Sequence, residues 1–354
     1  MSGELYVIRP KVASPILMQM IKAACGSVQA ITVTEADEIP DLSNKRLLLA
    51  LDLNEAGFCI PIIQIISQLF KRGETALQDS KAALLIYSPN EYNTKSTASD
   101  IIFHLNQLGC KFPGHPVIEA VGSLANFRTW QKTLSLSLLE ICLDQCSKLG
   151  ARIMEFHPFE MKTPYIVALH SSSHNTSNTL ALWNMVKRHL TNCKIEELHV
   201  ENGTVMDCKG CSFKTCSHYS KQSSCFYGGV LVKEIYPAIE KADGVVWICP
   251  NYNDAVSANI SAVINRLTAL YRKTSFYEKA LYGVVVSGNS GSDSVAMQLV
   301  DALCINKGFY LPANFCITAT ANDPGAIYEV EEIDKIAQAF AKNINRNYEI
   351  NKLL

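Results

Sequence analysis

The feature that most constrains the fold is a regular alternation of short apolar runs and amphipathic segments from residue 164 onward. Apolar runs typical of buried strands cover residues 165–170, 244–250, 282–287 and 315–320. Segments with apolar residues at helical spacing cover residues 179–190, 258–271, 295–307 and 330–345. Buried strands that alternate with amphipathic helices are typical of a parallel sheet covered on both faces. We therefore predict a three-layer α/β/α domain at residues 164–354.

The N-terminal half shows the same order, with strand-like runs at residues 5–8, 29–33, 47–53, 82–88 and 117–120. A constant offset of 199 residues superimposes polar and helix-terminating positions of the two halves: Asn54-Glu55-Ala56 on Asn253-Asp254-Ala255, Ser88 and Asn90 on Ser287 and Asn289, Gly109 on Gly308, and Pro113 on Pro312. The alternative is that any two α/β halves can be aligned this well. We predict a tandem pseudo-repeat, with domains at 1–156 and 164–354 and a linker at 157–163.

Composition excludes several classes of partner. A formal net charge of −1 gives no electrostatic basis for binding nucleic acid or an acidic membrane. The most hydrophobic stretch, residues 57–70, is too short and too often interrupted by polar residues to span a bilayer. The chain does not begin with a pattern typical of a secretory signal. We expect a cytoplasmic protein with neither nucleic-acid nor membrane partners.

A polar loop follows the run that ends at His170 and leads directly into a helix. Hydroxyl and amide groups at a helix N-terminus, together with the positive end of the helix dipole, can hold a phosphate. One or two of these residues would also be explained as a helix cap. The candidate phosphate-binding residues are Ser171, Ser172, His174, Thr176, Ser177, Asn178 and Thr179.

Two further polar loops follow the next buried strands. Ligands of open parallel sheets bind beyond the carboxyl ends of the strands, so all three loops should meet at one edge. Proline fixes the backbone of the second loop, and its tyrosine offers a flat surface with a polar tip. Each loop alone could be an ordinary turn. The candidate residues are Pro250, Asn251, Tyr252, Asn253, Asp254 and Ala255 in the second loop, and Ser287, Gly288, Asn289, Ser290 and Gly291 in the third.

These loops, in this order, resemble the NADPH-dependent FMN reductase family, whose first loop reads approximately Gly-Ser-Pro-Arg-x-x-Ser-Asn-Thr. Aligning its end with 177–179 places Ser172 on the family serine, Ser171 on the glycine and His174 on the arginine. The resemblance covers the C-terminal half. It implies a flavodoxin-like fold, an FMN phosphate in the first loop and the flavin ring between the other two. The chain has neither a phosphate-loop lysine motif nor a Gly-x-Gly-x-x-Gly motif, which disfavours nucleotide hydrolysis and a dinucleotide fold.

Four of the thirteen cysteines are clustered in residues 208–225: Cys208, Cys211, Cys216 and Cys225. Four thiolates at such spacing can converge on one tetrahedral ion or one cubane cluster. The segment resembles that of iron-sulfur flavoproteins, relatives of the same reductases, in which a tighter cysteine motif ligates a 4Fe-4S cluster. We predict a 4Fe-4S cluster, with zinc as the alternative. The other nine cysteines are typical of small buried apolar residues.

The N-terminal half lacks both features. Its first strand leads into a proline-containing segment at residues 9–15 with few hydrogen-bond donors, and it has no cysteine cluster. We predict a degenerate copy that binds no flavin. Because the simple reductases commonly form homodimers with FMN near the interface, the resemblance implies that this copy supplies the wall otherwise provided by a second subunit. Homodimerisation of the whole chain is the other arrangement considered.

The predicted function is an FMN-dependent oxidoreductase that takes hydride from NADPH or NADH and passes electrons to a small-molecule or protein acceptor, directly or through the cluster. The flavin supplies the redox chemistry, so no catalytic acid or base is assigned. Two alternatives belong to other classes. One is a flavodoxin-like electron-transfer protein with a protein partner, and the other is a non-catalytic scaffold whose cysteines hold zinc.

Overall fold

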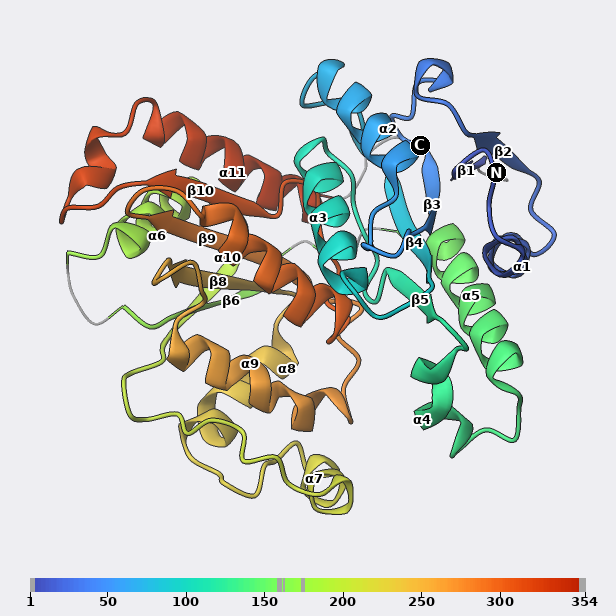
Figure 1. Ribbon diagram of the computed structural model, residues 1–354. Helices are drawn as coiled ribbons and strands as arrows, with labels where there is room; N and C mark the ends of the chain where they lie inside the picture. Colours follow the sequence, from blue (N-terminus) through green and yellow to red (C-terminus); the bar gives the residue numbers. More distant parts are fainter. Residues whose placement is uncertain (1–3, 158–160, 162, 173–175, 350–354) are drawn as a thin grey trace. The chain divides into compact units, whose positions relative to one another are not determined.

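The chain folds into two compact units, Met1–His157 and Pro158–Leu354. The computed structural model describes residues 4–157, 161, 163–172 and 176–349 (Figure 1). Each unit has a five-stranded, fully parallel sheet between helices. The predicted linker at residues 157–163 falls at the boundary, and only part of it lies within the described residues.

In the N-terminal unit the strand order is β2-β1-β3-β4-β5. The strands are β1 (Leu5–Ile8), β2 (Ala30–Val33), β3 (Arg46–Asp52), β4 (Lys81–Ser88) and β5 (Val117–Val121). The helices are α1 (Pro15–Cys25), α2 (Ile60–Lys71), α3 (Thr94–Gln107), α4 (Arg128–Gln131) and α5 (Leu138–Glu155), with 3-10 turns at Ala36–Glu38 and Ala125–Phe127. Helices α1 and α5 pack together on one face, and α2 and α3 cover the other (Figure 1).

Local sequence explains where these helices begin and how closely they approach. Ser14 caps α1, and Pro15 occupies its first turn, where a missing N–H costs nothing. A reciprocal capping box between Ser137 and Glu140 starts α5. Gly150 lets α5 lie against α1, because a Cβ there would stand 1.8 Å from the carbonyl oxygen of Ala24. The result is a core of apolar side chains between this helix pair and the sheet.

The apolar stretch at residues 57–70 forms α2 and the turn that precedes it. Ile62, Ile65 and Leu69 face the core and are buried. No helix in the part of the chain that the structure describes is both long and apolar enough to cross a bilayer.

In the C-terminal unit the strand order is β10-β9-β8-β6-β7. The strands are β6 (Tyr165–His170), β7 (Lys194–His199), β8 (Gly244–Pro250), β9 (Ala280–Ser287) and β10 (Cys316–Thr320). Numbered from the start of each unit, both sheets have the order 2-1-3-4-5, which is that of flavodoxin-like folds. The predicted fold class, two three-layer flavodoxin-like units with parallel sheets, is confirmed.

The helices of the C-terminal unit are α6 (Asn178–Arg188), α7 (Phe213–Ser220), α8 (Tyr236–Lys241), α9 (Ala258–Tyr271), α10 (Ser292–Leu299) and α11 (Ile333–Tyr348). Helix α6 packs against α11, and α9 lies beside α7 and α8 (Figure 1). A π-helical segment, Leu231–Ile235, precedes α8, and a 3-10 turn at Ala326–Glu329 precedes α11. The helix predicted at residues 295–307 is wrong in detail, because α10 ends at Leu299 and continues as a π-helix, Val300–Ile305.

The offset of 199 residues between the units holds in part. Gly109 and Gly308 both adopt positive φ, at 95° and 81°, directly after a helix. The offset fails near β8: Leu53 donates to the carbonyl of Tyr87, whereas Asn251 donates to that of Val286. The two donors, Leu53 and Asn251, are 198 residues apart, whereas the two acceptors, Tyr87 and Val286, are 199 residues apart. The superposition of Asn54 on Asn253 is therefore wrong by one residue, because the C-terminal unit has one more residue between these two strands.

Candidate functional site

Four loops meet at the carboxyl edge of the C-terminal sheet, after β6, β8, β9 and β10. The predicted first, second and third loops follow β6, β8 and β9. These strands are neighbours in one parallel sheet, so their loops open at the same edge. The fourth loop, after β10, was not among the predicted site segments.

The first loop is shaped by hydroxyl contacts. Ser172 Oγ and Ser177 Oγ share a hydrogen bond of 2.9 Å, and Ser171 Oγ bonds Ser257 Oγ at 2.8 Å. Ser177 is also the N-cap of α6 and accepts from the N–H of Leu180. The predicted residue His174 lies outside the described residues. The loop thus presents serine hydroxyls beside the N-terminus of an eleven-residue helix.

The side chain of Asn178 joins two loops, whereas the sequence analysis predicts a contact with a phosphate. Its side-chain Nδ2 donates to the carbonyls of Ala321 (3.1 Å) and Asp323 (2.8 Å), and its Oδ1 accepts from the N–H of Gly325 at 3.0 Å. The amide is therefore used to join the start of α6 to the fourth loop. Thr179, in the first turn of α6, is buried, whereas Thr176 is exposed.

The second loop is a tight two-residue turn. Asn253 and Asp254 both have positive φ, 57° and 56°, and Tyr252 and Ala255 on either side form an isolated antiparallel bridge. Asparagine and aspartate are the residues that most readily adopt two successive left-handed conformations. The turn leaves the ring of Tyr252 60% exposed at the edge of the site.

Asn251 ties the second loop to the third. Its Nδ2 donates to Ser287 Oγ at 2.9 Å and to Asp254 Oδ1 at 3.1 Å. Its Oδ1 is buried and has no hydrogen-bond partner among the described residues. An acceptor left in this state costs free energy unless a ligand donates to it. This orphaned oxygen is the clearest sign of a ligand at the edge of the sheet.

The third loop is narrow and held from both sides. Ser287 is buried, and its Oγ also bonds Ser292 Oγ at 2.7 Å. Thr320 donates to the carbonyl of Asn289 at 2.9 Å, which links this loop to the end of β10. Gly291 has φ of 92°, and a Cβ there would overlap Asp254. The four loops are therefore cross-linked into one edge, with small residues and backbone groups facing outward.

Two histidines stack at the far side of this edge. The rings of His170 and His199, at the ends of β6 and β7, lie 4.8 Å apart and nearly parallel. Burial and the neighbouring His199 lower the pKa of His170. The neutral imidazole is therefore favoured directly before the first loop.

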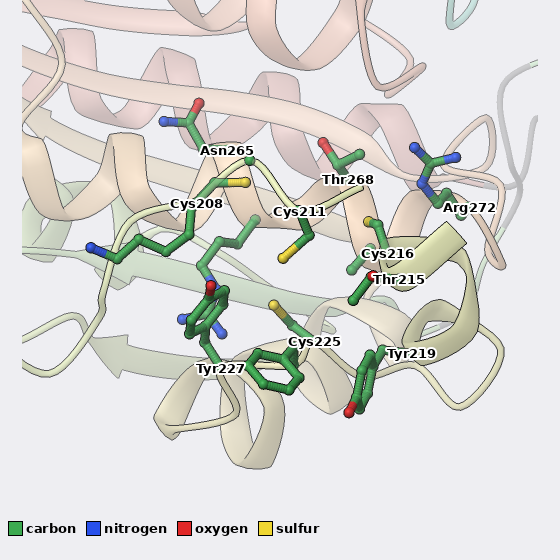
Figure 2. A pocket seen from close by; sticks show the side chains of 15 residues that line it. Cys208, Cys211, Thr215, Cys216, Tyr219, Cys225, Tyr227, Asn265, Thr268 and Arg272 are labelled. Atoms are coloured by element: carbon green, nitrogen blue, oxygen red, sulfur yellow. The ribbon is translucent and has the colours of Figure 1, made fainter. Parts of the chain in front are cut away.

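The four clustered cysteines line one cavity of about 140 Å³ (Figure 2). The cavity lies between the loop that follows β7 and helix α9. In Figure 2 the sulfurs of Cys211 and Cys225 point toward one another, with Cys208 and Cys216 on either side. Burial raises the pKa of Tyr227, another lining residue, and the neighbouring Cys211 raises it further. Of the other nine cysteines seven are buried, and Cys25 and Cys193 are half-buried.

The cysteine cavity is not a closed single-ion site. Within the described part of the chain, no three His, Cys, Asp or Glu side chains are grouped closely enough to hold one metal ion. The described lining residues include Lys209, Arg266 and Arg272 but neither Asp nor Glu. The Asp207 carboxylate stands directly before Cys208, so the surroundings of the thiols still carry an excess of positive charge, which fits an anionic thiolate-bound group. His218 does not line the cavity.

Two solved structures resemble part of this chain. An NAD(P)H:quinone oxidoreductase from Methanothermobacter marburgensis is 14% identical with a TM-score of 0.39, covering 54% of this chain and 98% of that one. An FMN-dependent NADH-azoreductase from Bacillus anthracis, solved with FMN, is 10% identical with a TM-score of 0.35, covering 54% of this chain and 100% of that one. No curated protein matches the chain.

The family comparison concerns the C-terminal unit alone. The sequence model of the NADPH-dependent FMN reductase family matches residues 164–323. This range begins just before β6 and ends in the loop after β10, so it contains the first three loops and the start of the fourth. Residues 164–323, most of the C-terminal unit, therefore match the NADPH-dependent FMN reductases, a family of flavin oxidoreductases.

Proposed function

We propose that the C-terminal unit binds one FMN at the carboxyl edge of its sheet and oxidises NADPH or NADH, passing the electrons to a small-molecule or protein acceptor. The observation that carries this proposal is the set of four cross-linked loops, which the family range covers up to residue 323. Among these loops the buried Asn251 Oδ1 has no hydrogen-bond partner in the described residues. Bound FMN supplies the hydride-accepting chemistry.

The first loop would hold the phosphate. Ser172 and Ser177 offer hydroxyls, and the N-terminus of α6 adds unpaired N–H groups and the positive end of the helix dipole. The contacts of Asn178 support a modified assignment for this residue. It positions the phosphate loop by tying α6 to the fourth loop, rather than contacting the ligand through its side chain.

The second and third loops would hold the flavin ring. Asn251 Oδ1 can accept a hydrogen bond from a ring N–H, while its Nδ2 keeps Ser287 in place. The exposed ring of Tyr252 can cover one face of the flavin. Backbone N–H groups of Gly288 and Gly291 can donate to ring oxygens, because glycine leaves their approach open, whereas the N–H of Ser290 already donates to Asn289 Oδ1. The protein thus orients the ring and shields it from water.

Cys208, Cys211, Cys216 and Cys225 would hold a 4Fe-4S cluster that receives electrons from the flavin. The shared cavity, which all four cysteines line, supports this proposal, with one zinc ion as the alternative. Helix α9 connects the two sites. Its cap, Ser257, contacts the first loop, and Arg266 at the cavity lies nine residues further, about 14 Å along the axis.

The N-terminal unit would bind no flavin. The start of α1, where a phosphate would lie, is occupied by the carboxylate of Asp52, which bonds Ser14. Homodimerisation of the whole chain is a further part of the proposal. A reducing compartment such as the cytoplasm would keep the cavity thiols available.

The visible spectrum of protein purified without oxygen tests the proposal. Flavin absorption with about one FMN per chain, and NADPH or NADH oxidation faster than that of free FMN, would support a flavin reductase. Slow reduction by both nicotinamides would favour an electron carrier. Protein that neither carries nor takes up FMN in a fluorescence titration would overturn the proposal.

A further inference from the structure

Arg266 joins the two ends of the cysteine loop. This residue lies on α9 and is only 3% exposed. One terminal nitrogen donates to the carbonyl of Met206 at 3.1 Å, two residues before Cys208, and the other donates to the carbonyl of Gly228 at 2.9 Å, three residues after Cys225. One guanidinium therefore closes the segment that carries all four cysteines.

Other residues of α9 fix the same segment from the outside. Asn265 donates to the carboxylate of Asp207 at 2.9 Å, and Asn259 donates to the carbonyl of Val200 at 3.1 Å. These contacts position the start of the loop without contributing charge. The two Arg266 bonds are different in kind, because they place a buried positive charge at the cavity.

The Arg266 side chain has one hydrogen-bond donor that no described residue uses. It lines the cavity, and its Nε is buried with no hydrogen-bond partner in the described part of the chain. Lys209 and Arg272 also line the cavity, and the nearby carboxylate of Asp207, which interacts electrostatically with Arg266, can balance only one of these three charges. A lining with more cations than carboxylates fits a cavity whose contents are negatively charged.

We propose that Arg266 is the positioning and charge-compensating residue of the cysteine cavity. It holds the four cysteines in one place and balances the negative charge of a thiolate-bound metal group. This proposal rests on the proposed metal-binding role of the cysteines, although not on whether the group is a cluster or zinc. Lysine would retain the charge but could not replace the planar fork that reaches two carbonyls.

The test compares full-length wild type with Arg266→Gln, Arg266→Lys and a charge control, Lys342→Gln. Lys342 is exposed on α11 and does not line the cavity. Iron, sulfide and the midpoint potential of the cluster are measured after anaerobic purification. Zinc affinity is measured separately on reduced, metal-free protein by competition with a chromophoric chelator.

Arg266→Gln should lose iron and shift the midpoint potential to more negative values, because reduction adds negative charge that the arginine no longer balances. Its zinc affinity should fall about tenfold, as is usual when a residue that supports metal ligands is lost. Arg266→Lys should keep the wild-type potential but also lose iron. Lys342→Gln should match wild type in all three measurements.

Unchanged iron content, potential and zinc affinity in Arg266→Gln would overturn the proposal. A potential shift in Arg266→Lys equal to that in Arg266→Gln would remove the charge-compensating role. Wild-type protein without iron or sulfide would overturn the proposed cluster. The zinc titration would then still decide the role of Arg266. Equal zinc affinities of wild type and Arg266→Gln would contradict the proposed role.

Discussion

The carboxylate of Asp52, at the end of β3, accepts hydrogen bonds from both the backbone N–H and the hydroxyl of Ser14, the N-cap of α1; the Oγ–Oδ1 distance is 2.8 Å. The equivalent position in the C-terminal unit, by sheet register, is Pro250. The N-terminal unit therefore neutralises its own helix terminus, and the C-terminal unit has no carboxylate at that position.

Replacing Asp52 with alanine should destabilise the N-terminal unit. The substitution removes two charge-assisted hydrogen bonds and a negative charge at a helix N-terminus, with an expected loss of about 2 kcal/mol in the free energy of unfolding. Urea denaturation followed by circular dichroism measures this change. Asp37→Ala, at an exposed position, is the control. Equal stability of the two variants would show that the contact contributes nothing.

Ser287→Ala and Ser88→Ala form a matched pair, since both serines are buried at the ends of equivalent strands. Ser287→Ala should weaken binding of FMN and of riboflavin to a similar degree, because Ser287 accepts from Asn251 near the proposed ring site. Ser88→Ala should leave the affinity and the ratio of one flavin per chain unchanged. Fluorescence titration gives both values, and a second flavin per chain would contradict the degenerate assignment of the N-terminal unit.

Ser172→Ala should discriminate between FMN and riboflavin. A hydroxyl donor to a charged phosphate contributes about 1.5–3 kcal/mol, which is roughly tenfold to a hundredfold in Kd. Riboflavin has no phosphate, so its affinity should change little. Titrations of both ligands against wild type and variant measure the ratio. A parallel loss for the two flavins would place the phosphate elsewhere.

Single alanine substitutions of Cys208, Cys211, Cys216 and Cys225 should each reduce the metal content. A 4Fe-4S cluster requires about four irons and four sulfides per chain, whereas a structural site requires one zinc. Cys193→Ala, which changes a half-buried cysteine outside the cavity, should retain the wild-type content. Elemental analysis that finds zinc alone, with flavin bound, would identify a pure flavin reductase.

His170 should make the C-terminal unit less stable in mild acid. Its pKa in the folded unit is lowered from 6.5 by burial and by His199, so the unfolded chain binds a proton more readily. The free energy of unfolding should therefore fall as the pH drops through 6.5 toward the folded value. His170→Gln should flatten this dependence in melting curves recorded from pH 8 to pH 5. An unchanged slope would assign the acid sensitivity to other groups.

The sequence was most informative where strands are buried on both faces. Continuous apolar runs located β6 and β8 to the residue. The edge strand β7 has no such run, because Glu196 and Glu197 interrupt it, and its residues were not assigned. The π-helical continuation of α10 was missed because its apolar spacing is close to that of an α-helix.

The three predicted loops do lie at one edge, but their internal contacts could not be predicted. Asn178 was interpreted as a phosphate-loop residue, and only the fold shows that its amide reaches the loop after β10. That fourth loop also carries polar residues, Asn322 and Asp323, close after the end of a strand, so the rule used for the other loops could have found it. Arg266 could not be identified from sequence, because its role depends on a loop that is distant along the chain.

The hydrogen bond between Asn178 and Ala321 joins residues 143 positions apart. Chains leave the ribosome N-terminus first, and domains generally fold as units in that order. The N-terminal unit is complete once His157 has emerged, but the hydrogen bond that holds the loop at Asn178 cannot form until Ala321 has been synthesised. A site built from these two loops can therefore form only near the end of translation, after the whole N-terminal unit has been synthesised.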